Sequence, residues 1–96
     1  MIVYEVNLTI EREILDDFNR WLKEHVKEIL EFPGFDRAEI YMEEELENSI
    51  SVRYFLQKRE DLQNYLDNHA KKMRGKGIEK FKDKFSAQRR ILFLQS

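Results

Sequence analysis

The sequence predicts an α+β fold in which four antiparallel strands and two helices follow one another in βαββαβ order. Four segments alternate between apolar and polar residues, as strands do, and two repeat their apolar residues every three or four positions, as amphipathic helices do. The chain also repeats itself, because residues 20–30 (RWLKEHVKEIL) and 64–74 (NYLDNHAKKMR) align at an offset of 44 residues. The same offset lays residues 5–10 over 49–54, so a strand and its following helix recur together. Right-handed crossovers then place both helices on one face of the sheet.

Length and composition limit the possible classes of protein. The 96 residues are expected to form a single domain, 1–96. The chain has no cysteine, which excludes disulfides, thiol nucleophiles and cysteine metal sites and favours a cytoplasmic location. The alternating N-terminus carries Glu5, unlike a signal peptide, and the longest apolar run is residues 91–94, so we expect no membrane segment.

Charge is distributed unevenly along the chain. Residues 71–90 hold nine Lys and Arg against two acidic residues, a net of +7, whereas residues 1–70 hold eight against seventeen, a net of −9. Such polarity is compatible with a partner of complementary charge or a second copy of the chain, but a solvated surface is the favoured explanation for each cluster.

The first half of the chain predicts a strand, a helix and a turn. Residues 2–10 alternate, with an apolar core face opposite Val3, Glu5, Asn7 and Thr9. Residues 12–31 form a helix with one apolar stripe; its members are Ile14, Phe18, Trp21, Leu22, His25 and Ile29. Pro33 and Gly34 end this helix, since proline cannot continue it and glycine permits a turn.

The middle of the chain predicts a hairpin. Residues 35–43 and 49–57 alternate as strands, and an acidic loop from Glu43 to Asn48 joins them. The side chains expected away from the helices are Arg37, Glu39 and Tyr41 on the first strand and Ser51, Arg53, Phe55 and Gln57 on the second.

The last part of the chain predicts a helix over residues 59–74, which Gly75 and Gly77 end. A short helical turn around Ile78 and Phe81 follows, and then a strand over residues 86–95. We expect Leu92 and Leu94 to face the helices; the opposite face of this strand then carries Ala87, Arg89, Ile91 and Phe93. The uncovered sheet face would thus be apolar, and a second copy of the chain is the simplest cover for it.

Several segments resemble one small uncharacterised bacterial family of the dimeric α/β-barrel superfamily, which includes antibiotic-biosynthesis monooxygenase and EthD-like domains. The matching features are Trp21 and His25, then REDLQNYLDNHAKKMR over residues 59–74, and the run from Phe81 to Phe85 that leads into Arg89. The resemblance implies a ferredoxin-like fold whose sheets pack face to face in a homodimer around a central cavity. It implies no activity that transfers to this chain.

Six residues are candidates for ligand binding. His25 and His69 lie on the apolar helical stripes, each four residues after an aromatic residue, and a histidine there either completes the core or contacts a ligand. The other candidates are strand residues expected toward the cavity: Asn7, Tyr41, Arg53 and Arg89. The two arginines would hold an anionic ligand or form ion pairs with Glu5 or Glu39.

Other sites are disfavoured by the pattern of residues. Histidines are not spaced as metal ligands, so we expect no metal and no cofactor. Haem-degrading relatives share the position of Asn7, but Tyr65 replaces their tryptophan and His69 follows too soon. RNA-recognition modules have the same element order, but their glycine-aromatic signature is missing and the chain is acidic, so we expect no nucleic acid.

The expected function is therefore a homodimeric domain that binds a small, partly apolar molecule. The main alternative is a cofactor-independent enzyme of the monooxygenase or isomerase type, with no catalytic residue identified. An RNA-binding or purely structural interaction module is the remaining alternative.

Overall fold

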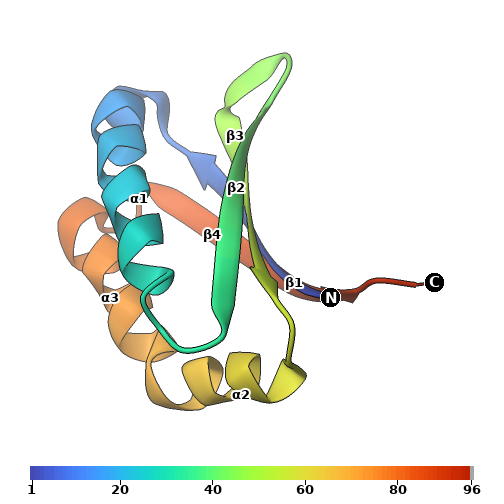
Figure 1. The fold of residues 1–96 in the computed structure, drawn as a ribbon. Helices are drawn as coiled ribbons and strands as arrows, with labels where there is room; N and C mark the ends of the chain where they lie inside the picture. Colours follow the sequence, from blue (N-terminus) through green and yellow to red (C-terminus); the bar gives the residue numbers. More distant parts are fainter. Residues whose placement is uncertain (96) are drawn as a thin grey trace.

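The computed structural model describes residues 1–95 and contains the predicted four-stranded sheet with its helices (Figure 1). The elements in chain order are β1 (Ile2–Ile10), the short 3-10 turn η1 (Arg12–Ile14), α1 (Leu15–Ile29), β2 (Phe35–Glu43), β3 (Leu46–Leu56), α2 (Arg59–Asn68), α3 (Ala70–Phe81) and β4 (Phe85–Phe93). The strands are antiparallel in the order β2-β3-β1-β4. Figure 1 shows the helices on one side of the sheet and nothing over the other side. The fold is the predicted ferredoxin-like α+β arrangement.

Most element boundaries agree with the sequence. β1 and β2 occupy the predicted residues, and the first helix begins with the turn η1 before α1. β3 begins at Leu46 rather than at residue 49, so the acidic loop shortens to a tight turn at the end of a long hairpin.

The second helix differs from the prediction, because it breaks at His69 and not at the glycines. His69 ends α2 with φ −131° and ψ −29°, and α3 then continues through Gly75 and Gly77 to Phe81. Ala70, Met73 and Phe81 are buried, so packing on the sheet holds this segment helical despite its glycines. A Cβ at Gly77 would lie 3.0 Å from Cη2 of Trp21, so any larger residue there requires the tryptophan ring to shift.

β4 also differs, because its two faces are the reverse of those predicted. Val6 is opposite Arg89 and Leu8 is opposite Ala87, and residues directly opposite each other in an antiparallel sheet point to the same face. The odd-numbered residues of β4, including Arg89, therefore face the helices, whereas Leu92 lies on the uncovered side. The apolar run at residues 91–94 has no clear alternation, so the pairing with β1 decides the phase.

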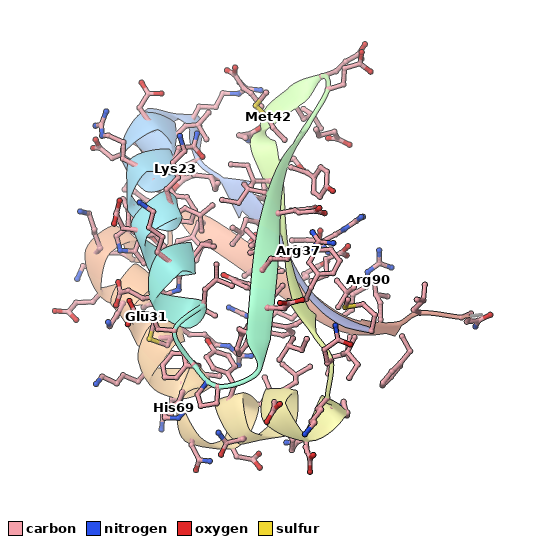
Figure 2. All side chains as sticks on the ribbon, in the orientation of Figure 1. Lys23, Glu31, Arg37, Met42, His69 and Arg90 are labelled. Atoms are coloured by element: carbon pink, nitrogen blue, oxygen red, sulfur yellow. The ribbon has the colours of Figure 1, made fainter. Side chains whose placement is uncertain are left out.

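The reversed strand makes the uncovered sheet face polar, so the expectation of an apolar face is wrong. Ile91 moves to the helix side, and polar residues of β4 take its place: Ser86, Gln88 and Arg90. Val3, Phe55 and Leu92 are the apolar residues left there, and each is half-buried. Arg37 and Arg90 project from this side in Figure 2, away from the helices.

The core lies between the sheet and the helices. Its helical residues include Phe18, Leu22, Leu62, Tyr65 and Met73; its strand residues include Tyr4, Leu8, Ile10, Val52, Tyr54 and Leu56. Trp21 packs at the margin of this core, half-buried. No helix within residues 1–95 is long and apolar enough to span a membrane.

Candidate functional site

The uncovered sheet face carries a network of hydrogen bonds centred on Glu5. Only 1% of Glu5 is exposed, and its carboxylate accepts bonds from Nε of Arg90 at 2.6 Å and Nε of Arg53 at 2.9 Å. Asn7 Nδ2 donates to the same carboxylate at 2.9 Å, and Ser51 Oγ donates to Asn7 Oδ1 at 2.5 Å. Arg90 thus forms the ion pair with Glu5 that was one of the two alternatives for Arg89.

This network also fixes the ionisation of Glu5. The hydrogen bonds from Arg90, Asn7 and Arg53 stabilise the carboxylate and outweigh the effect of burial, so the pKa of Glu5 falls to about 2. The carboxylate is therefore ionised at neutral pH.

Tyr41 belongs to a neighbouring cluster on the same face. Its hydroxyl donates to Glu39 at 2.5 Å, Arg37 donates to Glu39 at 2.6 Å, and the Arg53 guanidinium lies 5.1 Å from the centre of the Tyr41 ring. Asn7, Tyr41 and Arg53 are therefore all engaged by groups of their own sheet face.

A cavity of about 50 Å³ lies between the sheet and the helices, on the opposite side of the sheet from this network. We call it the helix-side pocket. Its walls are mainly aromatic and aliphatic and come from β1, β3, β4, α1, α2 and α3; the aromatic members are Tyr4, Phe18, Trp21, Tyr54, Tyr65 and Phe85. The pocket opens to solvent within a single chain and needs no second copy to form it.

Three basic side chains line the helix-side pocket. His25 comes from α1, Arg74 from α3 and Arg89 from β4. Arg74 Nη2 donates to the Tyr4 hydroxyl at 3.0 Å, which ties α3 to the sheet at this point. The reversed phase of β4 thus brings two of the predicted candidates, His25 and Arg89, into one cavity, although not the cavity that the sequence suggested.

His25 is the buried polar group of this pocket. It is 9% exposed, and its ring stacks on Trp21 with centroids 4.4 Å apart. Nδ1 is buried without a hydrogen bond to any described residue, so the ring has unused bonding capacity. Burial lowers the pKa of His25, and the charges of Lys76 and Arg89 lower it further against the opposing effect of Glu28. The imidazole is therefore neutral at neutral pH.

Two tyrosines of the pocket, Tyr54 and Tyr65, stay protonated. Burial raises the pKa of Tyr65 to about 12 and raises that of Tyr54 as well. Their hydroxyls are thus available as neutral hydrogen-bond donors over the physiological range.

His69 lies outside this pocket. It is half-buried where α2 meets α3, its ring stacks on Phe32 at 4.4 Å, and it lines a broad groove on the outer surface with Glu31 and Lys72 (Figure 2). The internal repeat therefore places its two histidines in different environments.

The sequence left several pocket residues unassigned. Tyr4 and Tyr54 lie on strand faces that were expected to form the core, and Arg74 belongs to the basic segment 71–90, for which no contact was predicted. The sequence feature that could have indicated the pocket is the presence of Tyr4 and Tyr54 at core positions of two strands. A buried tyrosine hydroxyl usually needs a polar partner, so a polar group was to be expected near them. The contact between Arg74 and Tyr4 spans seventy residues of sequence and follows only from the fold.

The chemistry of the pocket is that of a binding site with neutral and cationic groups. No group of three or more metal-binding side chains occurs among the described residues. His25 can exchange a proton or a hydrogen bond with a bound molecule, and the arginines can stabilise negative charge.

Solved structures with the same fold support this description of the architecture. A mutant of SnoaB, a cofactor-independent oxygenase from Streptomyces nogalater, aligns over 99% of this chain and 94% of its own, with a TM-score of 0.77 and 13% identity. A Deinococcus radiodurans protein described as an antibiotic biosynthesis monooxygenase aligns over 100% of this chain and 94% of its own, with a TM-score of 0.81 and 6% identity. A conserved protein from Methanosarcina mazei aligns over 99% and 94%, with a TM-score of 0.74 and 16% identity.

Identities this low establish the fold and nothing about chemistry. No curated protein matches the sequence. One family model does match, over residues 1–94, which is nearly the whole chain. The chain is thus a member of the family described as Domain of unknown function (DUF4286), with the fold of the antibiotic biosynthesis monooxygenases.

Proposed function

We propose that this protein binds a small, partly apolar molecule in the helix-side pocket. The observation that carries the proposal is His25, a buried neutral side chain on the pocket wall whose Nδ1 has no hydrogen bond to a described residue. An apolar cavity with a few polar groups is the usual form of a small-molecule site. The pocket holds about 50 Å³, so its ligand is small, or the Trp21 and His25 rings shift as it enters.

A matched pair of variants tests this proposal. In His25→Phe a ring of similar size removes the polar atoms from the pocket, whereas His69→Phe makes the same change outside it. A thermal-shift screen of small aromatic and aliphatic compounds should find ligands that stabilise the wild type and His69→Phe but stabilise His25→Phe much less. A screen in which no compound raises the wild-type melting temperature would contradict the proposal.

His25 also favours a second function, a cofactor-independent enzyme that removes a proton from its bound molecule. A neutral imidazole in an apolar pocket is a suitable general base. The same compounds should then exchange a carbon-bound proton in D₂O with the wild type and not with His25→Phe, as followed by NMR. If the ligands bind but show neither proton exchange nor chemical conversion, the enzyme hypothesis is wrong and the protein is a binding domain.

The protein is further proposed to act as a homodimer through the uncovered sheet face, in the cytoplasm. The uncovered face and the small size of the chain support the dimer, because a domain of this length buries a limited fraction of its surface alone. The absence of cysteine supports a reducing compartment.

A further inference from the structure

The charges at the helix-side pocket are not balanced within the protein. Arg74 and Arg89 line it, and neither forms a salt bridge with a carboxylate among residues 1–95. No Asp or Glu of the described chain lines the pocket. The opposite sheet face provides the contrast, because Arg53 and Arg90 there both form salt bridges with Glu5.

Both arginines line the pocket together with its polar groups. Arg74 is anchored by its hydrogen bond to the Tyr4 hydroxyl. Arg89 lines the same pocket as His25, Tyr54 and Tyr65, because the pairing of β4 with β1 turns it towards the helices. Two cationic groups thus converge on a cavity whose remaining walls are neutral.

We propose that the ligand is a small carboxylate with an apolar body, whose carboxylate is bound by Arg74 and Arg89. The apolar body would lie against Trp21 and Phe85. A guanidinium suits a carboxylate because its planar donors form two parallel hydrogen bonds with it. This inference rests on the proposed function of the pocket and adds the charge and chemical class of its ligand.

Pairs of acids and neutral amides of equal size separate this inference from the proposed function. Acetate, propionate and benzoate are titrated into the protein by calorimetry at fixed ionic strength, beside acetamide, propionamide and benzamide. At least one acid should bind, at least about tenfold more tightly than its amide, because a charged hydrogen-bonding partner is lost in the amide.

Three arginine variants locate the binding. Arg89→Gln and Arg74→Gln should each weaken acid binding about tenfold or more and leave amide binding unchanged. Arg90→Gln is the matched control, because it removes the same charge from the adjacent position of β4 on the other face of the sheet, and it should bind the acid as the wild type does. Arg89→Lys keeps the charge without the planar fork and should lose only part of the affinity.

The possible outcomes are distinct. Equal binding of an acid and its amide in the pocket would overturn the carboxylate inference and leave the pocket as a small-molecule site. An equal loss in Arg90→Gln and Arg89→Gln would also overturn it, because general charge attraction would then explain the binding. Failure of all six compounds to bind the wild type would overturn the inference and count against the proposed function as well.

Discussion

Glu5 shows how one residue can determine the character of a whole sheet face. It is almost fully buried on the side that no helix covers, because two arginines and an asparagine close over it. Exposed ion pairs contribute little to stability, but a buried carboxylate with several donors contributes more, and its removal leaves those donors without a partner.

We therefore expect Glu5→Gln to lower the free energy of unfolding by about 1–3 kcal/mol at neutral pH. The effect should depend on pH, because the pKa of Glu5 is about 2 in the folded chain against an ordinary value of 4.5. Stabilisation by the carboxylate is complete above about pH 4.5 and is lost as the pH falls towards 2. Urea denaturation of both proteins from neutral to acid pH measures this, with Glu39→Gln on the exposed cluster as control. A difference between wild type and Glu5→Gln that persists unchanged at the acid end would contradict the role given to the network.

At the scale of elements, α3 is a helix formed against its local preference. Gly75 and Gly77 lie in its interior, where each costs about 0.5–1 kcal/mol relative to alanine. Burial of Met73 and Phe81 and the bond from Arg74 to Tyr4 offset this cost. The two glycines differ in their surroundings, since a Cβ at Gly75 meets nothing within 4 Å and a Cβ at Gly77 meets Trp21 at 3.0 Å and Phe85 at 3.3 Å.

Alanine at the two positions should therefore have different consequences. Gly75→Ala should stabilise the protein by about 0.5–1 kcal/mol and raise its melting temperature by a few degrees. Gly77→Ala should gain less or lose stability, and it should perturb the fluorescence of Trp21 because the ring must move. Calorimetry and tryptophan emission of both variants measure this. An equal rise in melting temperature for the two would mean that α3 and α1 are not closely packed at Gly77.

For the whole molecule, the decisive feature is the sheet face without a cover. It is more polar than the sequence suggested, but Val3, Phe55 and Leu92 still lie among its charged groups. The guanidinium of Arg37 lies 3.9 Å from the centre of the Phe55 ring. A carboxylate in place of this ring would lie beside that positive charge, so a glutamate at position 55 should not unfold a single chain. Protein interfaces commonly combine apolar side chains with polar groups that already have hydrogen-bond partners, so this face is compatible with a second copy of the chain packed on it.

If the homodimer forms there, Phe55→Glu should dissociate it while the chain stays folded. Light scattering at micromolar concentration and circular dichroism measure the two properties separately. Ile78→Glu introduces the same charge at an exposed apolar residue of α3 and should leave the oligomeric state unchanged. A wild-type mass equal to that of one chain would contradict the proposed dimer.

The sequence by itself determined the order and type of the elements, because the alternation in β1 and the stripe of α1 are local patterns that each require one buried face. It also identified His25 as a candidate, since a histidine on an apolar stripe must lie in or near the core. The ion pair of Arg53 with Glu5 was one of the two alternatives that it left open for that residue.

Only the tertiary structure decided the phase of β4, the break at His69 and the location of the cavity. The last strand has apolar residues on both faces near its end, so its phase depends on pairing with β1, a partner more than seventy residues away. That pairing moves Arg89 from the open face to the helix side, where it joins His25 from α1 and Arg74 from α3. Local periodicity cannot specify such a meeting of distant segments, because it depends on how the strands register and how closely α3 packs against Trp21.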